Sequence, residues 1–352
     1  AQYYTHLVYG FSPLISTVKW QLEDPTVNEV QRYSAFNGLK NDRPRLKTML
    51  SLGGDLPNIA PMSQMVADPS KRSHFINTTI AYVRKYGFDG IDIDWEFPTD
   101  GSRGGSPSDA AGFAAFVSDL RIAIDNEARG RSTKLLLSSI VPGGPFWGQY
   151  YLINQTIADL DWVNILAYNV LGTWGSQTDC SAPLENPHNI QSDSVANALK
   201  YYLQLASQRG VRGDKFNLGL SFWGIAYKLK KAIGASSSSP GVGTPSYTNG
   251  ESPATPGFCT RQPGYLAYFE IDRIRSNSSI ISTPVVEDGV SKCQYFTYNS
   301  DQWVAYDDQK TLSEKIDLGL ALGLTGVSVW GMDADKPGSW DLTESVYSKI
   351  IN

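Results

Sequence analysis

Residues 88–98 read Phe-Asp-Gly-Ile-Asp-Ile-Asp-Trp-Glu-Phe-Pro, in which acidic and apolar residues alternate. Successive side chains of a β-strand point to opposite faces, so Asp92, Asp94 and Glu96 share one face and the apolar residues between them share the other. We expect the apolar face to pack under helices and the acidic face to point into the interior of a barrel. Same-face neighbours lie roughly 7 Å apart, so this placement costs hydration and adds repulsion. Folding alone does not favour such a row, which therefore indicates a functional site.

Such a row cannot be fully ionised away from water, so protons are shared within it and at least one pKa is raised. A carboxyl group that is still protonated near neutral pH can act as a general acid. Glu96 is the candidate, because it comes last on the strand and barrel enzymes build their active sites at the carboxyl ends of strands. The alternative is a row of metal-binding or solvated acids on an edge strand. The strongly apolar opposite face, and the lack of a His nearby in the sequence, weigh against it.

Short segments rich in β-branched and apolar residues alternate along the chain with segments of helical periodicity, as in a parallel sheet with crossover helices. The predicted strands are 6–12, 46–54, 88–97, 135–142, 161–169, 216–224 and 326–333. The predicted helices are 71–86, 108–129, 192–209, 311–323 and 340–351. This pattern predicts an α/β fold of the (β/α)8 TIM-barrel type with one strand fewer than the eight that close the barrel. A first unit upstream of Ala1, an irregular strand, or an open sheet would each explain that number.

The alternation breaks between the last two predicted strands, where residues 225–308 show no good crossover helix. This stretch holds a serine run at 236–239, several Gly and Pro residues, and aromatic segments at 264–270 and 295–298. We expect an α+β insertion domain there. The predicted domains are a catalytic barrel made of 1–224 and 309–352, and an insertion domain made of 225–308.

The composition excludes several classes of protein. The chain has 352 residues, 41% of them hydrophobic, which is enough for a large core and excludes intrinsic disorder. Lys and Arg total 30 against 35 Asp and Glu, and the charges are dispersed, so a nucleic-acid groove is not expected. No apolar stretch approaches the roughly 20 residues of a membrane span, and no signal pattern follows Ala1. We expect a mature, soluble, monomeric chain without membrane or nucleic-acid partners.

The three cysteines match no short metal-ligand spacing, so neither a metal nor a cofactor is expected. Three glycosylation sequons are compatible with a secretory route, although each is a weak signal by itself. We expect a disulfide between Cys259 and Cys293, with Cys180 free or paired outside this chain. The sequons begin at Asn77, Asn154 and Asn277.

The spacing of Asp89, Asp92, Asp94 and Glu96 resembles the D-x-x-D-x-D-x-E pattern of glycoside hydrolase family 18, which comprises chitinases and chitinase-like lectins. Further segments resemble this family in the same order along almost the whole chain. They are 5–11 (second strand), 51–54 (the S-x-G-G of the third), 166–169 (the M-x-Y-D of the sixth), 329–330 (the Trp of the eighth) and 225–308 (the insertion domain of the deep-cleft subfamily). The resemblance implies a secreted barrel protein.

The resemblance also implies an activity, the retaining hydrolysis of β-1,4-linked N-acetylglucosamine polymers by a substrate-assisted route. Glu96 would protonate the glycosidic oxygen, and the sugar's own 2-acetamido oxygen would be the nucleophile. Asp94 would hold the acetamido N–H, and Asp92 would exchange a proton with Asp94. Tyr168 would hydrogen-bond the acetamido oxygen, and Ser51 would support the acidic row from the neighbouring strand.

By the same resemblance, Trp330 would form the floor under the bound sugar, with Tyr9 and Phe11 lining the same pocket and Trp223 nearby. Taken singly, aromatic residues such as these are more often part of a core; their joint order favours the functional interpretation. The partner would be chitin or a chito-oligosaccharide. Trp147 and Trp174 are further candidate stacking platforms, or else aromatic anchors of their loops.

The sequence departs from the family pattern at several positions. Asn169 stands where Asp is usual; it can still bond the acetamido group, but the lost charge should make Glu96 easier to ionise. We therefore expect a lower or narrower acidic pH optimum and a reduced rate. Trp223 and Ile225 replace a common Tyr and Arg, and Asp55 stands where many members have a Trp platform.

Three functions fit these residues. The leading hypothesis is a chitinase, because Glu96 is intact. The alternative is a chitin-binding lectin that is catalytically weak or inactive because of the substitutions around the pocket. An endo-β-N-acetylglucosaminidase that releases N-linked glycans is the third, and the inserted domain favours a long linear polymer over it.

Overall fold

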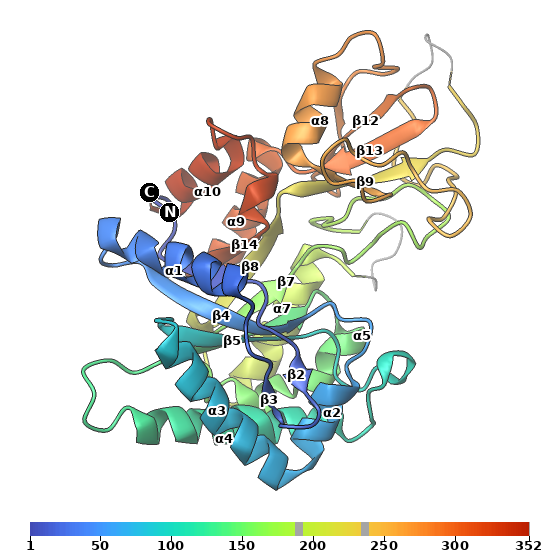
Figure 1. Cartoon of the computed structure of the whole chain (residues 1–352). Coiled ribbons are helices and arrows are strands. Elements are labelled where there is room, and N and C mark those ends of the chain that lie inside the picture. Colours follow the sequence, from blue (N-terminus) through green and yellow to red (C-terminus); the bar gives the residue numbers. More distant parts are fainter. Residues whose placement is uncertain (187–192, 234–238, 352) are drawn as a thin grey trace. The chain divides into compact units, whose positions relative to one another are not determined.

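The predicted parallel strands are present in a computed structural model of the chain, which describes residues 1–186, 193–233 and 239–351 (Figure 1). Contacts divide the chain into two units, which are described separately. The first unit comprises 1–164 and 202–216, and the second comprises 165–201 and 217–352.

The first unit holds the strand that bears the acidic row. Four strands pair in parallel in the order β1 (His6–Tyr9), β4 (Lys47–Gly54), β5 (Gly90–Trp95) and β6 (Leu136–Pro142). The next strand, β7 (Trp162–Leu166), begins in this unit and ends in the second. All six residues of β5 are buried, which fits a strand covered on both faces.

Helices cover this sheet. The prediction that the apolar face of β5 packs under a helix is confirmed, because the Trp95 ring lies edge-on to Phe113 of α4 with 6.3 Å between centroids. The helices are α1 (Val27–Asp42), α2 (Ala60–Ala67), α3 (Pro69–Lys85), α4 (Asp109–Glu127), α5 (Pro145–Gly148) and α6 (Ile153–Thr156). Shorter elements are the hairpin strands β2 (Ile15–Ser16) and β3 (Gln21–Leu22) and the 3-10 turns at Gly101–Arg103, Gln149–Tyr151 and Gly213–Lys215.

Four of these helices, α1, α2, α5 and α6, are absent from the sequence prediction. Helix α1 has one fully buried side chain, Tyr33, so its apolar periodicity is weak. Its start is nevertheless marked by a capping box, in which the Glu29 N–H donates to the Thr26 hydroxyl and the Glu29 carboxylate accepts from the Thr26 N–H. That Thr-x-x-Glu spacing is the signal that could have located the helix.

The second unit holds further parallel strands. The end of β7 is followed in the sheet order by β8 (Phe216–Ser221) and β14 (Gly326–Trp330), which pair in parallel. The seven predicted strands are therefore confirmed, and no eighth strand joins the sheet among the residues described. Helices α7 (Val195–Ser207), α9 (Gln309–Ala321) and α10 (Asp341–Ile351) match the predicted helices, although the predicted start of α7 at Ser192 lies outside the described residues.

An antiparallel sheet lies between β8 and β14 in sequence and confirms the predicted α+β insertion. The predicted strand 216–224 is in fact divided, since β8 ends at Ser221 and β9 starts at Trp223 in a different sheet. The strand order is β10 (Tyr265–Ala267), β9 (Trp223–Lys228), β13 (Gln302–Tyr306), β12 (Gln294–Tyr298) and β11 (Val286–Glu287), and the one helix described there is α8 (Tyr268–Arg275). Most of the serine run, 236–238, lies outside the described residues.

The predicted Cys259–Cys293 disulfide is wrong. Cys293 is bonded to Cys180, 113 residues away in sequence, and Cys259 is a free, exposed thiol. Both bonded cysteines belong to a buried cluster with Tyr227 and Trp303 of the antiparallel sheet. The loop after β7 is thus fastened to the insertion by tertiary packing, which cysteine spacing does not encode.

Candidate active site

The acidic row lies at the carboxyl half of β5 in the first unit. Asp92 is 3% exposed and accepts hydrogen bonds from the hydroxyls of Ser51 at 2.8 Å and Ser138 at 2.6 Å. These serines lie directly opposite Asp92 on β4 and β6, so the register itself creates this contact. The Ser51 contact is the one that the sequence predicts. Ser138 was missed, although a polar residue inside the apolar strand 135–142 was a usable signal.

Asp94 is buried with less support. It is 9% exposed, and its Oδ1 atom has no hydrogen-bond partner among the described residues. Gly53 lies opposite it on β4 with φ +112°, and a Cβ there would sit 2.1 Å from the Asp94 carbonyl oxygen. A Cβ on Gly54 would approach the Phe11 ring to 2.9 Å. Gly53 thus lets β4 approach the backbone of β5 closely, and Gly54 leaves room for the Phe11 ring.

Burial raises the pKa of all three carboxyl groups, and neighbouring negative charges add to this effect at Asp94 and Glu96. Burial raises the pKa of Asp92, although the hydrogen bonds from its two hydroxyl donors act to lower it. Burial, followed by the charges of Glu96 and Asp92, raises the pKa of Asp94 well above its usual value. Burial and the charge of Asp55 raise the pKa of Glu96 to about 7, against a hydrogen bond with Asp94 and the positive charge of Arg103. A group with this pKa exists in both forms near neutral pH, so it can donate a proton in one step and accept one in the next.

Asp89, the first acid of the motif, has a different environment. It lies just before β5, and its Oδ2 atom accepts from Lys40 Nζ and from the Thr48 N–H, both at 2.9 Å. Burial opposes ionisation, but these donors outweigh it and hold the pKa of Asp89 below its usual value. Asp89 therefore anchors the start of β5 to α1 and β4.

Tyr151 is a second neighbour of the row that sequence reasoning missed. It is fully buried, and its hydroxyl donates to the Trp95 carbonyl oxygen at 2.5 Å. Burial and the charge of Glu96 raise the pKa of Tyr151, so the phenol stays protonated and holds the end of β5. Its position within a short 3-10 turn has no distinctive sequence signal.

The two aromatic residues nominated at the end of β1 have different surroundings. Tyr9 lies opposite Leu50, which lies opposite Ile91, so Tyr9 shares the apolar face of β5. Its ring packs against Tyr33 and Phe36 of α1, with 5.0 Å and 5.4 Å between centroids. This placement assigns Tyr9 a packing role, and Phe11, against Gly54, is the stronger candidate for contact with a sugar.

An aromatic pair follows β5 and β6. Phe97, directly after Glu96, stacks on Trp147 with 5.3 Å between centroids and 11° between ring planes. Phe146 beside it is 69% exposed and lies edge-on to Trp147. These rings form an apolar surface in the segments that follow β5 and β6, and Phe97 adjoins Glu96 in the sequence.

In the second unit, three nominated residues lie together. Trp223 lies edge-on to Tyr168 at 5.5 Å, and its indole N–H donates to the Asn169 Oδ1 atom at 3.3 Å. The Ser181 hydroxyl donates to the same Oδ1 and accepts from the Asn169 N–H, both at 3.0 Å. Ser181, which the sequence analysis does not predict, therefore holds both the backbone N–H and the side-chain oxygen of Asn169.

Trp330 and Ile225 are the last of the residues singled out in the sequence analysis. Trp330 ends β14, opposite Ser221, and is 44% exposed. Ile225 is 1% exposed and belongs to the core of the antiparallel sheet. An apolar residue there packs the insertion.

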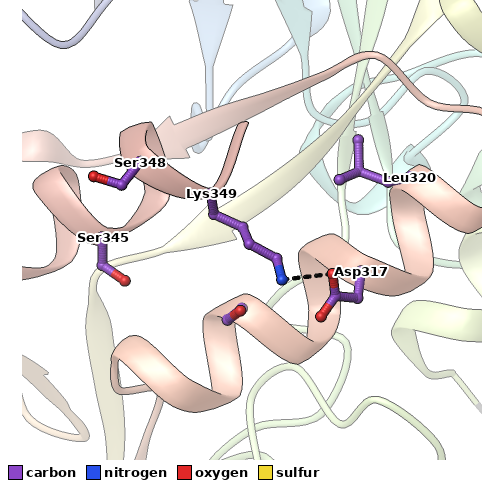
Figure 2. Close-up of a pocket in the computed structure, with 6 residues that line it drawn as sticks. Asp317, Leu320, Ser345, Ser348 and Lys349 are labelled. Carbon is purple, nitrogen blue, oxygen red and sulfur yellow. Dashed lines mark ion pairs between the residues drawn. The ribbon is translucent and has the colours of Figure 1, made fainter. Parts of the chain in front are cut away.

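A pocket of about 500 Å³ between α9 and α10 contains none of the nominated residues. Figure 2 shows Lys349 of α10 reaching toward Asp317 of α9, with 2.6 Å between the charged atoms. Its lining consists of Ser313, Asp317, Leu320, Ser345, Ser348 and Lys349.

Within 1–186, 193–233 and 239–351, no group of three or more His, Cys, Asp or Glu side chains is arranged to hold a metal ion. Across the same ranges, no helix has both the length and the apolar character of a membrane span.

A parallel α/β sheet with a buried row of carboxyl groups at the end of one strand is the architecture of a barrel-type glycoside hydrolase. The sequence profile of the glycosyl hydrolases family 18 matches residues 1–335, and the chain belongs to this family.

Its relatives include proteins named as chitinases. The chain is 30% identical to chitotriosidase-1 of Mus musculus over 333 residues, and 29% identical to an endochitinase of Manduca sexta over 340 residues. Both alignments cover 94% of this chain, but they span only 67% and 58% of the relatives' own lengths.

The fold is shared more widely than the activity. The crystal structure of human YKL-39, described as a pseudo-chitinase with retained chitooligosaccharide binding, superposes with a TM-score of 0.84 at 24% identity. The match covers 99% of this chain and 92% of that one. Proteins that share this fold therefore include named chitinases and a pseudo-chitinase.

Proposed function

We propose that this protein hydrolyses β-1,4-N-acetylglucosamine linkages in chitin and chito-oligosaccharides with retention, using Glu96 as general acid and base. The observation that carries the proposal is the environment of Glu96, whose pKa is raised to about 7 by burial and by the charge of Asp55. A packing role would not need an acid held half-protonated at the end of a barrel strand.

Glu96 protonates the oxygen of the scissile bond as the C1–O bond breaks. The carbonyl oxygen of the 2-acetamido group on the same sugar bonds to C1 and forms an oxazolinium ion. Glu96, now ionised, takes a proton from water as that water attacks C1 and reopens the ring. Glu96 thereby regains the proton that it gave to the leaving group.

Asp94 supports this nucleophile. Its unpartnered Oδ1 atom is a ready acceptor for the acetamido N–H, and its charge would offset the positive charge of the oxazolinium ion. Asp92 exchanges a proton with Asp94, and its oxygens stay hydrogen-bonded to Ser51 and Ser138 during that exchange.

The remaining roles follow from residue chemistry. The Tyr168 hydroxyl bonds the acetamido oxygen, with Asn169 and Trp223 beside it, and Trp330 provides the floor for the sugar ring. Phe11, Phe146 and Trp147 supply stacking surface, and Trp174, which is 62% exposed, is a further platform. Domain limits of 1–224 with 309–352 for the barrel and 225–308 for the insertion are part of this proposal.

We further propose a secreted monomer. The Cys180–Cys293 disulfide suits an oxidising compartment. Of the three sequons, the one at Asn277 lies in an exposed turn, whereas Thr79 and Thr156 of the other two are buried, so Asn277 is the preferred glycosylation site.

The test is mass spectrometry of chito-oligosaccharide products over time, with the wild-type protein and Glu96→Gln. We expect the substitution to reduce cleavage by about 10³-fold, since it removes the proton donor and keeps the shape. Glu23→Gln is the matched control, because Glu23 is an exposed residue outside the row.

The second candidate is a chitin-binding protein without turnover, which the pseudo-chitinase of the same fold favours. Binding of intact oligosaccharides without cleavage would support it and reject hydrolysis. Release of N-linked glycans from a glycoprotein would instead favour an endo-β-N-acetylglucosaminidase.

A further inference from the structure

Asp55 and Arg103 form a charged pair beside the acidic row. We propose that Asp55 makes the protein selective for partly deacetylated chitin, by binding the ammonium group of a glucosamine unit adjacent to the sugar on which Glu96 acts. This inference rests on the proposed function, because the reacting sugar must keep its acetamido group as nucleophile, whereas its neighbour need not.

The strand register places Asp55 next to the acid. Gly54, the last residue of β4, lies opposite Trp95, the last residue of β5. Asp55 and Glu96 are therefore the first residues beyond the same pair on adjacent strands. Their proximity is also felt electrostatically, since the charge of Asp55 raises the pKa of Glu96.

Arg103 only partly compensates this charge. Its Nη1 atom lies 2.7 Å from Asp55, but its Nε atom lies 2.7 Å from Asp100, so one guanidinium serves two carboxylates. Arg103 also donates to the Leu56 carbonyl oxygen at 3.1 Å and lies over the Phe97 ring, 5.5 Å from its centroid. Arg103 is thus held in place, and the group keeps a net negative charge beside Glu96.

The two carboxylates differ in their availability to a ligand. The Asp100 side chain is 13% exposed and also accepts from the Ser102 N–H and hydroxyl. The Asp55 side chain is 79% exposed, and its salt bridge among the described residues is the one with Arg103. Asp55 is therefore the carboxylate that an incoming cation can reach.

A glucosamine unit provides such a cation. Its 2-ammonium group donates charge-assisted hydrogen bonds to a carboxylate, whereas the neutral 2-acetamido group has one N–H and no charge. Since exposed ion pairs contribute little, we expect a preference of about threefold to fivefold, which weakens as salt is added.

The test compares kcat/KM for a fully acetylated hexamer and a partly deacetylated hexamer. Measurements at about pH 5 lie below the pKa of about 7 of wild-type Glu96, and comparing two substrates on the same variant cancels any change in the ionisation of Glu96. We expect Asp55→Asn to lower the ratio of deacetylated to acetylated kcat/KM by about threefold to fivefold. The matched control is Asp317→Asn, which removes another exposed ion-paired carboxylate, and it should leave the ratio unchanged.

Product sequencing adds a positional readout. Wild-type cleavage should leave glucosamine enriched at one fixed position relative to the broken bond, and Asp55→Asn should remove that enrichment. An unchanged ratio, or an equal fall for both substrates, would overturn the proposal.

Binding separates this inference from the proposed function. In a Glu96→Gln background, calorimetry should show the same preference for the deacetylated hexamer, and adding Asp55→Asn should abolish it. If the wild-type protein cleaves nothing while this binding preference persists, hydrolysis fails and the Asp55 site stands. If cleavage occurs without any preference, only the Asp55 site fails.

Discussion

Two buried carboxyl groups, Glu270 in the insertion and Asp94 on β5, show opposite solutions to the same electrostatic problem. Glu270 is fully buried and accepts four hydrogen bonds, from the Cys259 and Thr260 N–H groups, the Thr260 hydroxyl and the Ala267 N–H, at 2.6–3.0 Å. Asp94 is nearly as buried, yet its Oδ1 atom has no partner among the described residues and its carboxyl neighbours repel it. The donors around Glu270 hold it in a structural role, whereas Asp94 keeps an oxygen available for chemistry.

The largest expected effect in this comparison is on folding. Glu270→Ala leaves several buried donors unsatisfied, and we expect the free energy of unfolding to fall by about 3 kcal/mol or more. Urea titration followed by circular dichroism measures it. Asp94→Ala, which removes an unsatisfied acceptor and relieves repulsion, should cost clearly less. A larger loss for Asp94→Ala than for Glu270→Ala would invalidate the distinction.

A second prediction concerns stability and pH. The folded pKa of Glu96, about 7, lies above its unfolded value of 4.5, so between these values the folded state holds more protons. Stability therefore falls as pH rises, and the penalty is absent below the unfolded pKa and fully present above the folded one. Glu96→Gln removes it, so we expect this variant to gain about 3 kcal/mol relative to wild type between pH 4.5 and 7.5.

Denaturant titrations at several pH values test this. Glu23→Gln, as control, should follow the wild-type curve at each pH. If the difference in unfolding free energy between wild type and Glu96→Gln does not change with pH, the raised pKa of Glu96 does not affect stability.

The smallest expected effect concerns Asn169. Its Oδ1 atom accepts from Ser181 and Trp223, and a carboxylate would accept the same bonds, so Asn169→Asp should fold normally. In the proposed site, the added charge should disfavour ionisation of Glu96 and move the alkaline limb of kcat/KM upward by less than about one pH unit. Identical pH–rate profiles for Asn169→Asp and wild type would remove the argument that Asn169 tunes the acid.

The sequence predicts features that depend on neighbouring residues better than features that depend on contacts between distant segments. The alternation in 88–97 correctly predicts which residues of β5 share a face, because side-chain direction along a strand is set by local geometry. The face of Tyr9, in contrast, is decided by the pairing of β1 with β4, which places Tyr9 on the same side as the apolar residues of β5. Ser138, Tyr151 and Ser181 were missed for the same reason, since each contacts the site from a different segment of the chain.

The sequence by itself determined the alternation of strands and helices, the position of the insertion and the acidic face of β5, because all of these depend on periodicity within short segments. Only the tertiary structure decided which serines support Asp92, that Cys180 and not Cys259 bonds to Cys293, and that Asp55 lies beside Glu96. These are consequences of strand register and of packing between distant segments. A register arises from pairing between strands that lie far apart in the sequence, so the pattern within one strand does not determine it alone.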